Sequence, residues 1–575
     1  MAVKRSANGS RFPARRRGQV LWKAIGAELS GHVQREWFGC GPHRLVLAFP
    51  RPEGLAARPH DPRPADPAHG LKILAGTLAL DGGSLRIGPD GDPFDTASPS
   101  RRFAVSLHRL DWLPDLVAAG SDGARRALRL IDDWRRVFGK WNAFSWSPEC
   151  LERRVFHLAC AAKALAAEGS DAEVADLLTD IARQGRHLTE ITKAPERALE
   201  RAVVATVAGC VLAGQSGEGL IDKGLKALAR HIDRMVLPDG GHATRSPEAG
   251  VELLFDLLTL DDALGQRGRP SPEALSRAID RLSTATRFFT LGDGHLAAFH
   301  GGEAIAPARI AAALAHDDAG PRPLNAAPHS GYHKMVGGGL EVIADCGPPP
   351  AGPLSVAACA QPAALEIVCA KDRLITSCGW SPEAAGAHAF RLSDAASTVS
   401  VGDGSAGRPL SGFRAKALGP WLVDGATKVE AKRHDDVGGV WLDIVHDGWR
   451  HVGLQHARRL FLDAVADELR GEDSLTPIEA AADPNGPRRY LPFAVRFHLH
   501  PEARASIARD GKSVLIRGPN NIGWWLRNDA VDVQIAPTAH FDHGLARKAG
   551  QIVLKSQVRP EVGAKIRWKL TRAEG

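Results

Sequence analysis

The sequence predicts a two-part protein, in which an array of antiparallel helix pairs is followed by a large antiparallel β-sandwich. From about residue 105 to residue 290, apolar residues recur at steps of three and four, which is the pattern of amphipathic helices. After about residue 325 the period changes to two, and short β-branched segments alternate with turn residues. A chain of 575 residues is too long for a single core, so the change of period marks a domain boundary.

The predicted helices carry start signals as well as periodicity. Ser-Pro-Glu stands at residues 147–149, 246–248 and 271–273, in each case before an apolar-periodic segment. A serine hydroxyl caps free amides, proline suits the first turn, and an acid near the helix start meets the positive end of the helix dipole. Because the breaks between these segments are short and regular, neighbouring helices are expected to pack as antiparallel pairs in an α/α array.

The sandwich is predicted from about ten short segments with strand character. Typical ones are AALEIVCAKDRLITSCG at 363–379, GVWLDIVHDGW at 439–449 and AVRFHLHP at 494–501. Gly, Pro, Asn and Asp punctuate them, as the turns of an antiparallel sandwich require. The predicted domains are therefore a helical domain at 101–325 and a sandwich domain at 326–575.

Residues 1–100 are predicted to form a basic arm and an irregular lead-in. The arginine cluster within residues 14–18 is typical of a disordered arm with a weak potential to contact anionic lipid or nucleic acid. Residues 40–100 are rich in Pro and Gly, and the run LKILAGTLAL predicts a small strand or two.

The composition limits the partners and the compartment. A net charge of +7 suits an acidic partner, although a basic housekeeping surface explains it equally well. No nucleic-acid-binding module is recognisable, so no nucleic-acid partner is predicted. The eight cysteines are scattered without CxxC spacing and are interpreted as reduced packing residues. With no apolar segment behind the basic N-terminus and no apolar run long enough to span a bilayer, the expectation is a cytoplasmic protein without a membrane span.

One polar loop stands out between two helical segments, PDGGHATRSP at 238–247. The Asp-Gly-Gly turn reverses the chain, and Ser246 with Glu248 suits the start of the next helix. These needs do not explain His242 and Arg245, so we expect this pair to point into a groove. The alternative is that both side chains are solvated loop residues.

Several strings occur together in a characteristic order. They are PDGGHATRSP, LGDGHLAAFHGGE at 291–303, SGYHKM with ADCGPPP within 330–350, HDGW with GLQHARRLFL within 446–462, RGEDSL at 470–475, RFHLHP at 496–501, GWWLR at 523–527 and QIVL at 551–554. From roughly Trp112 to the C-terminus the chain resembles the heparinase II/III-like family of polysaccharide lyases. The resemblance implies an incomplete α/α toroid followed by an antiparallel β-sandwich, with the substrate cleft where the two meet. It also implies β-elimination on an acidic, uronic-acid-containing polysaccharide, and a periplasmic location as the alternative to the cytoplasm.

β-Elimination needs a group that neutralises the uronate carboxylate, a base and an acid. We interpret Arg245 as the carboxylate partner, because its planar fork matches that group, and His242 and Tyr332 as base and acid. Capping and solvation for the loop residues, and a buried anchor for Tyr332, are the structural alternatives.

Further substrate contacts are predicted for residues on both halves of the chain. They are Glu248, Trp146, His187, His446 and Arg458. Trp146 stands at a helix start, where its ring would stack on a sugar. Arg458 and Arg459 point to opposite faces of a strand, so at most one of them faces a shared cleft.

The chain departs from the family pattern at several acid and base positions. No Asn precedes His187, Glu248-Ala249 fills the place of a tyrosine, Cys359 stands near an expected histidine, and Ala395-Ala396-Ser397-Thr398 also lacks one. These replacements favour a second hypothesis, a catalytically degenerate carbohydrate-binding or envelope-biogenesis protein on the same scaffold.

No cofactor is predicted. His498 and His500 share one strand face at i, i+2, which allows a structural metal in the sandwich, but packing or a turn-end hydrogen bond is the simpler interpretation.

Overall fold

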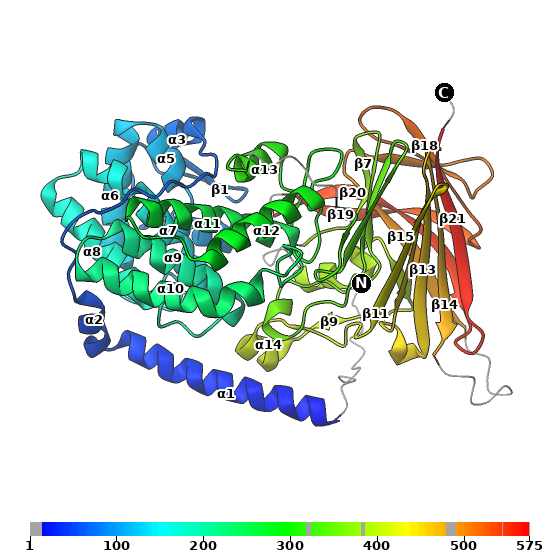
Figure 1. The fold of residues 1–575 in the computed structure, drawn as a ribbon, viewed down its shortest axis with the longest axis horizontal. Helices are drawn as coiled ribbons and strands as arrows, with labels where there is room; N and C mark the ends of the chain where they lie inside the picture. The colour runs from blue at the N-terminus through cyan, green and yellow to red at the C-terminus, as the bar shows by residue number, and fades with distance from the viewer. Residues whose placement is uncertain (1–13, 318–323, 381–385, 479–489, 543, 574–575) are drawn as a thin grey trace.

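The computed structural model describes residues 14–317, 324–380, 386–478, 490–542 and 544–573. Its helical half contains the helices that the sequence periodicity predicts. This half lies beside the sandwich (Figure 1). The helices are α4 (Arg101–Arg109), α5 (Leu113–Ala118), α6 (Ser121–Phe138), α7 (Pro148–Glu168), α8 (Asp171–Leu188), α9 (Ala198–Val211), α10 (Gln215–Met235), α11 (Pro247–Gln266), α12 (Glu273–Phe289) and α13 (Pro307–Leu314).

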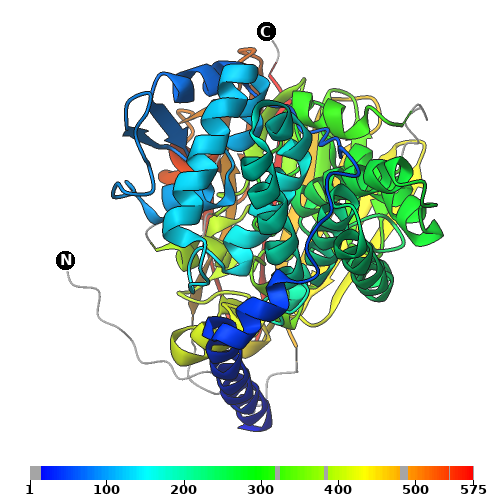
Figure 2. The same ribbon diagram turned by 90° about the vertical axis from the view of Figure 1, so that its left-hand side faces the viewer.

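The lead-in is more regular than the sequence predicts. It contains α1 (Ala14–Gly39), α2 (Gly41–Ala48), α3 (Pro67–Leu74) and the hairpin β1 (Thr77–Leu80) and β2 (Gly83–Arg86). The arginine cluster predicted as a disordered arm thus begins the helix α1, which runs outside the toroid toward α14 (Gly412–Leu418) in Figures 1 and 2. Its apolar residues are spread around the helix, with Trp22 and Val33 exposed, so the sequence lacked the one-sided pattern that identifies packed helices.

The predicted helix starts are confirmed with one shift. Ser246 caps α11 and accepts a hydrogen bond from the amide of Ala249 at 3.4 Å. Ser147 is the N-cap residue of α7, without a side-chain cap bond. At the third site α12 begins at Glu273 with Pro272 as its cap, because the Ser271 hydroxyl bonds Asp261 instead.

The second half is a sandwich of two antiparallel sheets. One has the order β11 (Val429–Asp436), β12 (Gly439–His446), β13 (Leu454–Asp463), β14 (Glu468–Pro477), β21 (Ala564–Arg572), β18 (Gly523–Asn528), β17 (Val514–Arg517) and β16 (Arg504–Ile507). The other has the order β19 (Asp532–Asp542), β20 (Leu545–Val558), β15 (Leu491–Leu499), β7 (Asp372–Thr376), β6 (Leu365–Cys369), β5 (Leu340–Asp345), β4 (Tyr332–Gly337) and β3 (Ala326–Ala327), with β8 (Val399–Val401) paired to β15. The short pair β9 (Arg408–Pro409) and β10 (Leu422–Val423) lies beside them.

The two halves share packed surface. The core of the helices includes sandwich residues, among them Tyr332, Ile343 and Val368, while a second core fills the space between the two sheets. Apolar burial of this kind contributes roughly 25 cal/mol per Å². The junction is therefore part of the folded interior rather than a gap between two bodies.

Within the described ranges, no helix combines the length and the apolar character that crossing a membrane demands.

Candidate functional site

The loop that carries the predicted site forms the contact between the two halves. Gly240 has φ 81°, and Val236 pairs with His242 across the turn. The Asp239 carboxylate accepts hydrogen bonds from the Ser330 amide at 2.7 Å and from its hydroxyl at 3.1 Å. The loop therefore clamps the first residues of the sandwich.

Arg245 lies inside this contact, and only 7 % of it is exposed. Its φ of 61° is in the left-handed region, which a non-glycine residue occupies at a cost that the surrounding contacts must offset. Its guanidinium donates to the carbonyl oxygens of Ser330, Gly331, Gly347 and Pro348 and to the carboxylate of Asp345, all at 2.5–3.0 Å. A sixth contact joins it to His300 Nε2 at 3.1 Å. Arginine has five N–H donors, so none is left over for a substrate.

Tyr332 meets Arg245, as the sequence predicts, and it is fully buried, which agrees with the alternative of a buried anchor rather than with a catalytic phenol. Its hydroxyl donates to the Arg245 carbonyl at 2.6 Å, and its ring lies 4.8 Å from the guanidinium carbon. The rings of Phe289 and Phe299 pack against it at 5.0 and 5.1 Å. Burial raises the pKa of Tyr332 well above its usual range, so the phenol stays protonated.

Two residues that sequence reasoning left unassigned complete this cluster. His300 Nδ1 accepts from the Cys359 amide, so its proton lies on Nε2 and is donated to Asp345 at 3.0 Å. The Arg245 and His300 contacts outweigh burial and lower the pKa of Asp345 to about 2. Asp345 belongs to the sequence ADCGPPP and His300 to LGDGHLAAFHGGE. No local pattern predicts that the two side chains are in contact. We call Arg245, His300, Tyr332 and Asp345 the junction cluster.

His242 and Glu248 do not join the junction cluster. His242 Nδ1 bonds the Thr244 hydroxyl at 2.6 Å, its Nε2 has no hydrogen-bond partner among the described residues, and burial lowers its pKa to about 3. The expectation that His242 and Arg245 both face a groove is wrong, because both side chains are buried. Glu248 accepts a hydrogen bond from the Glu303 amide at 2.8 Å, and burial raises its pKa to about 8.

Trp146 and His187 meet each other at a different place. Their ring centroids are 5.2 Å apart, and His187 also contacts Phe38 of α1 and His43 of α2. Trp146 donates to the Phe138 carbonyl at 2.9 Å. Both side chains are buried, and burial lowers the pKa of His187 to about 3, so the pair packs the lead-in helices onto the toroid.

His446 and Arg458 lie between the two sheets. His446 Nε2 contacts His456 Nδ1 at 2.8 Å, and Arg458 Nε donates to Asp473 at 2.7 Å. Arg458 is fully buried, whereas the side chain of Arg459 is 60 % exposed, which confirms that the two residues point to opposite faces. His446 and Arg458 are therefore buried in the interior between the sheets, not at a solvent-exposed surface.

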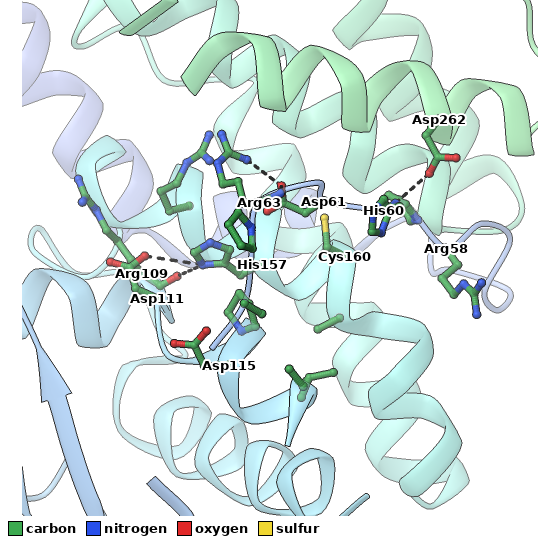
Figure 3. Close-up of a pocket in the computed structure, with 18 of the residues that line it drawn as sticks. Arg58, His60, Asp61, Arg63, Arg109, Asp111, Asp115, His157, Cys160 and Asp262 are labelled. Atoms are coloured by element: carbon green, nitrogen blue, oxygen red, sulfur yellow. Dashed lines mark hydrogen bonds and ion pairs between the residues drawn. The ribbon is translucent and has the colours of Figure 1, made fainter. Parts of the chain in front are cut away.

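An open cavity that sequence reasoning did not identify lies within the helical half, as Figure 3 shows. Its volume is about 810 Å³, and its walls come from the segment before α3 and from α4, α5, α7, α11 and α13. Five arginines and five carboxylates line it: Arg58, Arg63, Arg109, Arg153, Arg309, Asp61, Asp111, Asp115, Glu252 and Asp262. No single sequence motif predicts this cavity, because its lining residues are spread along the chain from Arg58 to Arg309.

Charged side chains in this cavity are arranged as pairs. Arg63 contacts Asp61 at 3.1 Å and Glu252 at 3.1 Å, and His157 lies 3.8 Å from Asp111. Burial lowers the pKa of His157 to about 4. The balanced charges suit a ligand that carries groups of both signs better than a polyanion.

The possible metal position is filled by other contacts. His498 Nδ1 lies 3.1 Å from the Thr538 hydroxyl, and its Nε2 lies 3.0 Å from the Asp394 carbonyl. Over the described part of the chain, no three His, Cys, Asp or Glu side chains gather in a geometry that would hold a metal ion.

Comparison with known proteins shows which family this chain resembles in sequence and fold. Residues 319–569 match the family model of the heparinase II/III-like C-terminal domain. The chain is 86 % identical over 578 residues to FtsZ-localized protein C of Caulobacter vibrioides (strain NA1000 / CB15N), with both chains covered completely. The solved structure of a heparinase III superposes with a TM-score of 0.71 at 12 % identity, covering 96 % of this chain and 92 % of the other. Heparan sulfate lyase HepC of Pedobacter heparinus gives 0.56 at 14 % identity, with 93 % and 87 % covered.

Proposed function

From the premise that the chain belongs to the heparinase II/III-like family, we propose that it is a catalytically degenerate member. It keeps the lyase scaffold as a binding body that localises with FtsZ, and it carries out no β-elimination. The localisation is transferred from the name of its relative, FtsZ-localized protein C.

The observation that carries this proposal is the saturation of Arg245. Elimination requires a cation or a hydrogen-bond donor that is free to neutralise a uronate carboxylate, and Arg245 is the residue predicted for that role. Here the Asp345 carboxylate already occupies Arg245 from inside the protein, at 2.5 Å. A substrate carboxylate would have to displace a buried ion pair, and breaking one costs about 3–5 kcal/mol.

The acid and base chemistry points the same way. A tyrosine base must reach the phenolate form, but Tyr332 has a raised pKa and donates its proton to a backbone carbonyl. His242 has a lowered pKa, and its side chain is hydrogen-bonded to Thr244 rather than to Tyr332 or to the guanidinium of Arg245. The three residues predicted to be catalytic therefore do not surround a space in which a sugar ring could react.

The alternative is a lyase that acts on an acidic polysaccharide. The lyase fold and the cavity of about 810 Å³ favour it. His157, whose pKa of about 4 keeps it neutral near pH 7, would then be the base, with the arginines around it as carboxylate partners. The equal number of acids in the same walls works against a polyanionic substrate.

Purified protein incubated with heparan sulfate, polygalacturonate or alginate separates the two. We expect no growth of the ultraviolet absorbance of the unsaturated uronate product, while a heparinase III control produces it. Product formation by the chain from any of these polymers would overturn the proposal. A fluorescent fusion of the chain should co-localise with FtsZ, and a diffuse signal would contradict the binding role.

A further inference from the structure

A row of aromatic and cationic side chains crosses the outer face of the eight-stranded sheet. β-Register places its members directly opposite one another on five neighbouring strands. In order they are Trp441, Phe461, Arg470, Lys569 and Arg527, which we call the cationic row. They line a hollow of about 520 Å³ on the face away from the sandwich core.

Of the two aromatic rings of the row, Phe461 is covered by Arg470, while Trp441 packs against Phe461 and stays partly exposed. Trp441 is 39 % exposed, and its ring centroid lies 4.6 Å from that of Phe461. The guanidinium carbon of Arg470 stands 5.6 Å from the Phe461 ring, and that of Arg527 stands 5.6 Å from the ring of Trp525. Stacking restricts the guanidinium planes in advance, which lowers the entropy cost of binding a carboxylate.

The row has more positive charge than its neighbours neutralise. Arg470 and Lys569 share a single carboxylate, that of Glu468, with Lys569 Nζ at 2.9 Å. Arg527 donates to the Thr571 hydroxyl at 3.2 Å and has no ion pair with a carboxylate in the part of the chain that the structure describes. Counted against Glu468 alone, the three cations leave two positive charges, while Asp510 attracts Arg527 more weakly without an ion pair.

The next row along the same strands is different. Arg459 pairs with Asp443 at 2.7 Å, and Arg567 pairs with Glu472 at 2.8 Å. These residues also lie opposite one another in the register. Arg459 and Arg567 of this paired row line the same hollow and are as exposed as Arg470, so they serve as matched controls for charge and position within it.

We propose that the cationic row binds an acidic segment of another polypeptide. Carboxylates of the segment pair with Arg470, Lys569 and Arg527, and a flanking apolar side chain packs on Trp441 and Phe461. Neighbouring strands are about 4.8 Å apart, so the three cations span roughly 10 Å. Acidic side chains on one face of an extended peptide repeat about every 7 Å and reach all three.

A peptide fits this surface better than an anionic glycan. Sugar rings stack on open aromatic faces, but here guanidinium groups cover the rings of Phe461 and Trp525. The row presents two guanidinium groups and an ammonium group beside the apolar rings of Trp441 and Phe461. The proposal is independent of whether the protein eliminates a polysaccharide, because the row lies on the outer face of a sheet and contains no residue of the junction cluster.

The test is fluorescence anisotropy of the full chain with a labelled oligoglutamate peptide that begins with leucine. Arg470→Gln combined with Arg527→Gln should weaken binding about tenfold or more, because each removes a charge-assisted hydrogen bond. Arg459→Gln combined with Arg567→Gln removes the same charge from the paired row and should change the Kd less than about threefold. Trp441→Ala should weaken the leucine-bearing peptide but leave a peptide of glutamate alone nearly unchanged.

Circular dichroism of each variant checks that the sheet is intact, which these exposed positions predict. Equal loss in both double variants would overturn the proposal, since it would show attraction by net charge only. Tighter binding of an oligogalacturonate than of the peptide, lost in the same variants, would assign the row to a glycan and also overturn it. An oligolysine peptide should not bind.

Discussion

The junction cluster and the helical cavity are built from the same residue types and differ in their access to water. Both place arginine, histidine and carboxylate side chains together. In the junction cluster the donors are saturated and the side chains are buried, whereas the cavity keeps Arg58 exposed and Arg309 about one-third exposed. The difference teaches that a cluster of catalytic residue types predicts a site only when solvent reaches it.

The largest effect is expected for Arg245→Ala. The variant leaves the Asp345 carboxylate buried without its main partner, and we expect a loss of about 3–5 kcal/mol in the free energy of unfolding. Urea denaturation followed by tryptophan fluorescence measures it. A loss below about 1 kcal/mol would show that the junction is not closed as described.

Tyr332→Phe should have a smaller effect of the same kind. The variant keeps the ring contacts but leaves the Arg245 carbonyl without the hydroxyl donor, which is expected to cost about 1–3 kcal/mol. The same denaturation series measures it. An increase in stability, or a change in polysaccharide turnover, would contradict a purely structural phenol.

A third prediction concerns the pH dependence of the free energy of unfolding, to which buried His242 contributes. Its pKa is lowered to about 3 in the folded protein, while an unfolded histidine takes up a proton near pH 6.5. Its contribution is therefore complete above about pH 6.5 and is lost as the pH falls toward 3. Between about pH 7 and 5, His242→Gln should lose about 1–2 kcal/mol less stability than the parent chain. Parallel pH profiles of the two proteins would refute this role.

The smallest effect is expected for Arg58→Ala in the cavity. This side chain is exposed, so its removal should change the free energy of unfolding by less than about 0.5 kcal/mol. It is the matched arginine control for Arg245→Ala. A loss as large as that of Arg245→Ala would erase the distinction between the two regions.

Local patterns predicted most of the fold. The steps of three and four residues identify α6 to α12, and alternation identifies strands such as β6, β12 and β15. They miss α1, whose apolar residues do not gather on one side, and β21, where KIRWKLTR alternates but was not recognised. The pairing of Tyr332 with Arg245 was also predicted, and its burial agrees with the alternative that the phenol is a buried anchor.

The sequence by itself determined the order of the two domains, the helix start at Ser246 and the opposite faces of Arg458 and Arg459, because each depends on residues within a few positions of one another. Only the tertiary structure decided that the predicted site is closed. Arg245 meets its carboxylate partner 100 residues further along the chain, and five strands that are distant in sequence align the cationic row. Whether a polar side chain faces water or a partner is a property of such distant contacts, and hydrophobic periodicity contains no information about them.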